Sequence, residues 1–279
     1  MQDVLIGAFV ISMMLSVGSD LTWDRLRAIT RKPVLLAGGL AAGYLVVPLS
    51  AWLLGRGLGL DPALHAGLLL CAAAPGGPIG ALFTQRANGD LALSVSLLMM
   101  VNLINVFATP ITLQALGATP GADLVGELLA MVATILAFQV IPLVTGVQLR
   151  ELRPKTAEVV GRWGRRFANA CLIAAVIGLG VSQYELLLKV DLRVLLAIQA
   201  LTLISMAAGW LLVPGPPEVR VAGALSNTVR SQSLSILLAS TRFPAPETLL
   251  VVISYSVLMF INGVAAAEIF RRTMPIRRA

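Results

Sequence analysis

Long apolar runs are the feature that most constrains the fold of this chain. Most of them reach the roughly 20 residues that a helix needs to cross the hydrocarbon core of a bilayer. Because the backbone finds no water in hydrocarbon, a spanning segment must satisfy its own hydrogen bonds as a helix. The predicted fold class is therefore an all-α polytopic membrane protein. Nine transmembrane spans are predicted, over residues 4–18, 33–54, 63–84, 91–113, 124–147, 167–188, 194–213, 221–239 and 249–270.

The composition supports this class and argues against others. Hydrophobic residues make up 57% of the 279 positions and charged residues only 13%, about half the share of a soluble domain. The net charge of +7 does not indicate nucleic-acid binding, because the basic residues fall in short clusters between apolar runs. We expect a lipid bilayer as partner, no nucleic acid, and a single membrane unit without a soluble domain.

Lysine and arginine predict the orientation in the membrane. Nine spans place the termini on opposite sides, and the loops on the carboxy-terminal side carry sixteen Lys and Arg residues against four on the other side. Loops rich in these residues stay in the cytoplasm. The amino terminus is therefore expected outside and the carboxy terminus in the cytoplasm, in a plasma (inner) membrane. The longest basic connection covers residues 148–166.

Two of the spans contain residues that interrupt a helix. Proline removes backbone hydrogen bonds and glycine adds conformational freedom, and the third span contains Pro75, Gly76, Gly77 and Pro78. The eighth span is too polar for a lipid-facing helix, because it contains Ser226, Asn227, Thr228, Arg230, Ser231, Gln232 and Ser233. A single interruption would be explained as a packing kink. Two interruptions in corresponding positions favour a binding site.

The spacing of the interrupted spans predicts an internal repeat. The spans are five apart in order, an odd number, so the two copies would enter the membrane in opposite orientations. This plan predicts an inverted repeat of four spans in residues 1–117 and five in residues 118–279. In transporters of this kind the broken helices meet near mid-membrane. We predict unwinding at residues 75–78 and 226–231, and a crossing of the two spans there.

Arg230 is the one basic residue predicted inside a span. A charge at that depth costs at least about 2.5 to 3.5 kcal/mol, so it normally faces a partner or a wet cavity. None of the fourteen carboxylates is expected at the same depth. Two compatible interpretations stay open: Arg230 meets an anionic substrate, or its charge ties together carbonyls at the helix crossing.

The predicted substrate-binding residues come from both interruptions and from the fourth span. Asn102 and Asn105 lie three positions apart, hence on one face of a helix. They line the cavity or form hydrogen bonds between helices, and both options are open. The full set is Arg230, Ser226, Asn227, Thr228, Ser231, Gln232, Pro75, Gly76, Gly77, Pro78, Asn102 and Asn105.

Several of these segments resemble the bile acid:sodium symporter family. The run from Ala74 to Pro78, the run Asn-Gly-Asp-Leu-Ala-Leu-Ser-Val at residues 88–95, and Thr109-Pro110 are similar to the family's broken helix and the helix after it. The order of spans is similar along essentially the whole chain, without the family's usual first helix, as in a divergent bacterial-type member. The resemblance implies a secondary transporter that works by alternating access.

The resemblance also implies that most of the family's sodium ligands are absent. Positions where the family has side-chain oxygen donors are occupied here by Gly43, Gly80, Ala81, Leu98, Ser226 and Arg230. Sodium needs several hard oxygen donors, and Ser94 and Ser226 are the remaining candidate ligands. We therefore expect transport of a small organic anion without strict dependence on sodium, and no other cofactor.

Two alternatives to this function remain. The chain could be a sodium-coupled symporter with a rearranged sodium site, or an anion channel or facilitator. A channel needs a continuous polar lining, whereas the polar residues here form isolated clusters. An enzyme is not expected, because the sequence contains no HExxH, GxSxG, GxGxxG or P-loop motif.

Overall fold

The computed structural model describes residues 2–30, 32–118, 123–182, 191–243 and 245–273. Regular structure in these ranges is entirely helical, as predicted, and contains no β-strand. In chain order the helices are α1 (Gln2–Ser19), α2 (Trp23–Thr30), α3 (Pro33–Ala41), the π-helical η1 (Ala42–Val46), α4 (Val47–Gly57), α5 (Pro62–Ala73), α6 (Ile79–Arg86), α7 (Leu91–Ala115), α8 (Leu124–Ile135), the π-helical η2 (Leu136–Val140), α9 (Ile141–Leu152), α10 (Pro154–Ser182), α12 (Leu192–Leu212), α13 (Pro217–Thr228), α14 (Gln232–Arg242) and α15 (Pro246–Thr273).

Several of these helices are long and apolar enough to cross a membrane. By length and composition, five stretches among the described residues qualify, namely Pro33–Gly57, Leu91–Ala115, Val125–Leu152, Leu192–Leu212 and Pro246–Thr273. Shorter apolar helices lie at Ile6–Ser19 and Pro62–Ala73. The chain is therefore an integral, multi-pass membrane protein. Nine spans stay a prediction, and residues 183–188 of the sixth predicted span lie outside the described residues.

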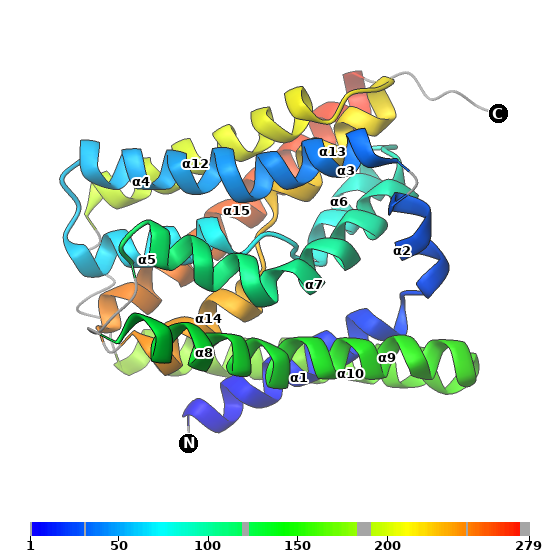
Figure 1. The fold of residues 1–279 in the computed structure, drawn as a ribbon, viewed down its shortest axis with the longest axis horizontal. Coiled ribbons are helices and arrows are strands. Elements are labelled where there is room, and N and C mark those ends of the chain that lie inside the picture. The colour runs from blue at the N-terminus through cyan, green and yellow to red at the C-terminus, as the bar shows by residue number, and fades with distance from the viewer. Residues whose placement is uncertain (1, 31, 119–122, 183–190, 244, 274–279) are drawn as a thin grey trace.

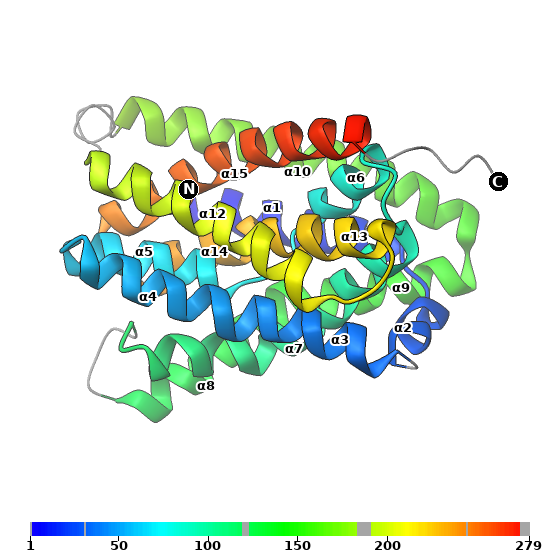
Figure 2. The ribbon, with the colours of Figure 1, turned by 90° about the horizontal axis from the view of Figure 1, so that it is seen from above.

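The helices are arranged in two parts. The first contains α1, α8, α9 and α10, which lie along the lower edge of Figure 1, and α1 packs against both α9 and α10. In the turned view of Figure 2, α10 and α8–α9 follow opposite edges with α1 between them. The second part contains the other long helices, where α12 packs on α4 and α13, and α15 packs on α5. The interrupted helices α5–α6 and α13–α14 both belong to this second part (Figure 1).

Close helix contacts depend on glycine. A Cβ atom on Gly18 of α1 would lie 2.0 Å from the carbonyl oxygen of Leu143, and one on Gly146 of α9 would lie 2.4 Å from that of Leu15. Glycine at both positions therefore lets the two backbones touch. Small residues at such contacts are the usual basis of helix association in membranes, where packing replaces the hydrophobic effect.

Replacing Gly18 should separate α1 from α9. The variant Gly18→Leu should lower the thermal unfolding temperature of the detergent-purified protein by several degrees, because overpacking costs about 1–3 kcal/mol. The matched control is Gly57→Leu, since a Cβ on Gly57 meets nothing within 4 Å. Equal unfolding temperatures for the two variants would show that the close contact of α1 and α9 is not needed.

Candidate functional site at the helix crossing

The two interrupted helices meet at their interruptions. α5 ends at Ala73 and α6 begins at Ile79, while α13 ends at Thr228 and α14 begins at Gln232. Between these ends, Pro75 and Arg230 form an antiparallel bridge. The amide of Ser231 donates to the carbonyl of Ala74 at 2.7 Å, and the amide of Gly77 donates to that of Val229 at 3.3 Å. The predicted interruption at residues 75–78 and its meeting with the eighth span are confirmed.

The interruption in the eighth span is narrower than predicted. Ser226, Asn227 and Thr228 remain helical, and the break covers residues 229–231. The side-chain amide of Asn227 donates to the carbonyl of Gly223 at 3.0 Å, and the hydroxyl of Thr228 donates to that of Ala224 at 2.8 Å. The polar side chains are thus satisfied by the preceding turn of the same helix and do not unwind it.

Glycine permits the close approach of the two breaks. Gly76 has a φ of +95°, which L side chains rarely adopt. A Cβ atom on Gly77 would lie 2.4 Å from the carbonyl oxygen of Arg230. The Gly-Gly pair is therefore required by the backbone geometry of the crossing.

A polar stripe on α7 supports the break between α5 and α6. Asn105 donates to the carbonyl of Pro75 at 2.9 Å, and Asn102 donates to that of Gly76 at 3.2 Å. Thr109, four residues after Asn105 on the same face, donates to the last carbonyl of α5 at 2.8 Å. The two asparagines therefore form hydrogen bonds between helices, one of the two options that the sequence left open.

Both π-helical turns contribute a residue that holds this stripe in place. Tyr44 in η1 donates to the side-chain oxygen of Asn105 at 2.5 Å. Gln139 in η2 donates to the side-chain oxygen of Asn102 at 2.8 Å. A π-helical turn redirects a side chain within a helix and is frequent at functional sites.

Arg230 is completely buried, with 0% exposure, and binds three acceptors from three helical segments. One terminal nitrogen of its guanidinium lies 3.2 Å from the carbonyl of Gly43 in η1 and 3.4 Å from that of Ala72 in α5. The other lies 3.3 Å from the hydroxyl of Ser205 in α12. Tyr255 lies close enough to interact electrostatically, but its hydroxyl does not meet the geometry of a hydrogen bond.

No carboxylate among the described residues forms an ion pair with Arg230. The carbonyl of Ala72 belongs to the last turn of α5, where the helix dipole is negative. A cation there is stabilised by that dipole and by the carbonyl oxygens. Within the described residues, the partners of the Arg230 guanidinium are therefore backbone and hydroxyl oxygens, and none is an acidic side chain.

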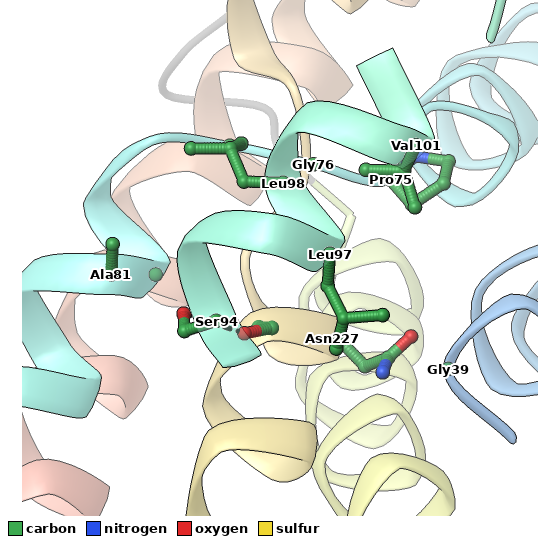
Figure 3. Close-up of a pocket in the computed structure, with 12 residues that line it drawn as sticks. Gly39, Pro75, Gly76, Ala81, Ser94, Leu97, Leu98, Val101 and Asn227 are labelled. Carbon is green, nitrogen blue, oxygen red and sulfur yellow. Dashed lines mark hydrogen bonds between the residues drawn. The ribbon is translucent and has the colours of Figure 1, made fainter. Parts of the chain in front are cut away.

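A small pocket next to the crossing contains the candidate sodium ligands. The hydroxyls of Ser94 and Ser226 lie 2.8 Å apart, and Thr84 donates to Ser94 at 3.2 Å. Figure 3 shows Ser94 and Asn227 in this pocket, together with the extended segment at Pro75 and Gly76. Its volume is about 20 Å³, enough for one water molecule or one small ion.

A larger space separates α1 from the crossing. Two adjacent cavities of about 360 and 840 Å³ share Met13, Pro78, Ile79 and Phe260 in their walls. We refer to them together as the crevice. Gln232, Ser233 and Ser256 are the side-chain hydroxyl and amide groups in the otherwise largely apolar smaller cavity. Arg230 also lines this cavity, but its guanidinium binds α5, η1 and α12, none of which contributes to the crevice.

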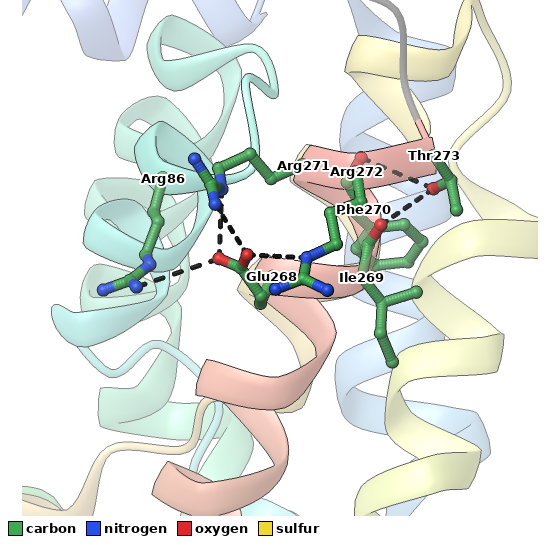
Figure 4. A network of polar contacts seen from close by, with 7 residues as sticks. All are labelled: Arg86, Glu268, Ile269, Phe270, Arg271, Arg272 and Thr273. Carbon is green, nitrogen blue, oxygen red and sulfur yellow. Dashed lines mark hydrogen bonds and ion pairs between the residues drawn. The ribbon is translucent and has the colours of Figure 1, made fainter.

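Charged residues occupy one end of the crevice. Arg86, Arg165 and Asp20 line its larger cavity, and Arg165 forms an ion pair with Asp20. Arg86 lies 3.8 Å from Glu268, which also binds Arg271 at 2.6 Å and Arg272 at 2.9 Å (Figure 4). This end of the crevice therefore contains more positive than negative groups.

The structure divides the predicted substrate-binding residues into three groups. Gly77, Pro78, Arg230 and Gln232 line the crevice. Pro75, Gly76, Gly77, Ser226 and Asn227 line the small pocket. The remaining four are buried: Asn102, Asn105 and Ser231 form hydrogen bonds with the break between α5 and α6, whereas Thr228 bonds to its own helix.

Comparison with known proteins identifies the family. Residues 8–212 match the sodium bile acid symporter family. The chain belongs to this family. It is 28% identical over 271 residues to the probable sodium/metabolite cotransporter BASS1, chloroplastic, of Arabidopsis thaliana, covering 94% of this chain and 65% of that protein.

Two animal proteins are similar over shorter stretches. The sodium-dependent organic anion transporter of Mus musculus is 27% identical over 179 residues, which cover 63% of this chain and 47% of the relative. The hepatic sodium/bile acid cotransporter of Homo sapiens is 26% identical over 187 residues, covering 63% of this chain and 51% of the relative. The chain spans less than two thirds of the length of these relatives. All three are named for transport, which agrees with the expectation that this family member is not an enzyme.

Some residues of the site were not expected from the sequence of this family member. Thr109 continues the face of Asn102 and Asn105, so helical spacing could have identified it. Tyr44 and Ser205 have no such signal: Tyr44 is the one polar residue of η1, and Ser205 is one of several polar residues spread along the apolar helix α12. Gln139 stands out as polar in its span, but its partner Asn102 is known only from the packing.

Loss of the hydrogen bonds that Asn105 of α7 makes at the break between α5 and α6 should destabilise this member of the symporter family. The variant Asn105→Leu leaves the carbonyl of Pro75 and the hydroxyl of Tyr44 with fewer partners, at a cost of about 1–3 kcal/mol for each buried group that stays unpaired. Its thermal unfolding temperature should fall by several degrees.

The matched control is Asn262→Leu. Asn262 is only partly buried and pairs with one side chain, Gln199. Its loss should have a smaller effect. If Asn262→Leu were as destabilising as Asn105→Leu, a special role of the α7 stripe would be ruled out.

Proposed function

We propose that this chain is a secondary carrier of a small organic anion, that it works by alternating access, and that it does not strictly require sodium. It would have nine spans in an inverted repeat of residues 1–117 and 118–279. The substrate would enter the crevice between α1 and the helix crossing. The observation that most supports this proposal is Arg230, a completely buried cation that binds carbonyl oxygens at the crossing.

Arg230 could supply the positive charge that sodium supplies elsewhere in the family. The carbonyls of Gly43 in η1 and Ala72 at the end of α5 converge on one nitrogen of Arg230, and oxygen atoms in that arrangement favour a cation. The resemblance places Arg230 where the family has a glutamine close to bound sodium. A guanidinium that is part of the chain would keep the crossing neutralised whether or not sodium is present.

The lining of the crevice favours an anion with an apolar part. Its smaller cavity is mainly apolar, with Gln232 and Ser256 bonded to each other at 2.7 Å. Arg86 and Arg165 lie in the larger cavity, where an anionic group could approach them. Two of the relatives are named for an organic anion and for bile acid, which supports this substrate class.

A second candidate function is a sodium-coupled symporter with a rearranged sodium site. The small pocket beside Ser94 and Ser226 favours it, because its volume of about 20 Å³ could hold one ion. An anion channel or facilitator is a further alternative. The transport experiments below distinguish all three.

Uptake should occur by exchange and without sodium. Bile acids, steroid sulfates and short carboxylates would first be screened for thermal stabilisation of the purified protein. With the best ligand, proteoliposomes preloaded with unlabelled anion should show counterflow of labelled anion, equally in sodium and in choline. Uptake that needs sodium would favour the symporter, whereas flux without counterflow would favour a channel.

Loss of the charge at Arg230 should abolish uptake. Arg230→Gln leaves the carbonyls of Gly43 and Ala72 without a cation, whereas Arg230→Lys keeps the charge and should retain part of the activity. The matched control is Arg242→Gln, because Arg242 also donates to a carbonyl and a hydroxyl, those of Ala130 and Thr134. Normal uptake by a folded Arg230→Gln protein would contradict the proposed role.

The connection at residues 148–166 should face the cytoplasm. It carries six of the sixteen basic residues on the proposed inner side. Single cysteines introduced there in a background without Cys71 and Cys171 should react with a membrane-impermeant maleimide only after the cells are opened. Labelling in intact cells would reverse the orientation.

A further inference from the structure

A separate cavity lies at the other end of the molecule. Its volume is about 500 Å³, within the usual range for small-molecule sites. It is bordered by the end of α4, the start of α5, the residues after α7 and the connection from α14 to α15. In Figure 1, α4 and α5 lie toward the left of the molecule and α6 lies toward the right. Arg86 at the end of α6 lines the charged end of the crevice, so this cavity is distant from that end.

The cavity contains a cation, the guanidinium of Arg56. Arg56 lines it and lies over the ring of Trp52, 4.2 Å from the ring centre. Among the described residues, Arg56 forms no ion pair, and no aspartate or glutamate lines the cavity. The stacking on Trp52 orients the guanidinium but leaves its charge unneutralised.

His65 also lines the cavity. The edge of its ring packs on α4, because a Cβ atom on Gly55 would lie 2.1 Å from the Cδ2 atom of His65 and 2.4 Å from its Nε2 atom. Nε2 is inaccessible to solvent. His65 therefore contributes part of the cavity wall, with Nε2 turned toward α4.

The remaining walls are mainly apolar. They include Leu60, Leu69, Leu116 and Phe243. A small inorganic anion would leave these surfaces uncovered, whereas a ligand with a hydrocarbon part would bury them. The combination of one cation and an apolar wall therefore selects for an amphipathic acid.

We propose that this cavity is a second binding site, separate from the crevice, for an organic carboxylic acid with an apolar body. The carboxylate would contact Arg56, and the apolar body would lie against the leucine and phenylalanine side chains. The site does not depend on the proposed transport activity.

The test measures binding to the purified, lipid-free protein. Trp52 would be made the only tryptophan by replacing Trp23, Trp163 and Trp210 with phenylalanine, and its fluorescence would be followed while 4-cyclohexylbutyrate is added. We expect a saturable change with the acid and none with the neutral 4-cyclohexylbutyramide. Arg56→Gln should weaken binding at least tenfold, as should Ala66→Leu, which narrows the cavity.

The matched control is Arg193→Gln. Arg193 lies close to Gly59, but its guanidinium is already bound to Asp191 and to the carbonyls of Leu58 and Gly59. Its loss should change the affinity for the acid less than twofold. Thermal unfolding of each variant, and of a second charge variant, Arg56→Met, would separate loss of the site from loss of the fold.

The anionic group bound in the cavity could also belong to a phospholipid. A second set of measurements distinguishes a carboxylic acid from a phospholipid as the ligand. The same variants would be placed in vesicles of phosphatidylcholine with or without phosphatidylglycerol. Stabilisation by phosphatidylglycerol that Arg56→Gln removes, with no binding of the acid in lipid-free protein, would overturn the proposal and assign the cavity to lipid. Equal binding of acid and amide, or unchanged binding by Arg56→Gln and Ala66→Leu, would overturn it as well.

Discussion

The structure depends on the pairing of backbone groups that two helix breaks expose inside an apolar interior. An unpaired carbonyl or amide in such surroundings costs several kcal/mol. Here five successive carbonyls are satisfied by five donors on two other elements, α7 and the break between α13 and α14. The donors are Arg230 for Ala72, Thr109 for Ala73, the amide of Ser231 for Ala74, Asn105 for Pro75 and Asn102 for Gly76. The polar residues of otherwise apolar helices therefore have a structural reason to be there.

The same constraint explains how a buried arginine that has no carboxylate partner in the described part of the chain is tolerated. Desolvation of Arg230 is offset by the carbonyls of Gly43 and Ala72, the hydroxyl of Ser205 and the negative end of α5. In return, the guanidinium connects η1, α5 and α12 to the break in α13–α14. A side chain that joins so many elements affects both the stability of the crossing and its electrostatic potential. This dual effect links the fold to the proposed independence from sodium.

Residue patterns predicted the class of the protein better than the roles of its polar residues. The Pro-Gly-Gly-Pro run predicted the first break, because those residues cannot continue a helix. The second break was predicted too wide, because the sequence does not show that Asn227 and Thr228 bond back to their own helix. Asn102 and Asn105 were recognised as one polar face, but their partners lie about 30 positions earlier in the chain. Only the packing of α7 against the break reveals them.

The sequence by itself determined an all-helical membrane protein with two interrupted helices and one buried arginine, because apolar length, proline, glycine and charge act locally. Membership of the symporter family follows from the sequence as well. The tertiary structure alone decided which oxygens surround Arg230, that its guanidinium is directed away from the crevice, and that Arg56 and His65 share a cavity. These properties depend on contacts between residues distant in the chain, and such contacts are set by how the helices pack.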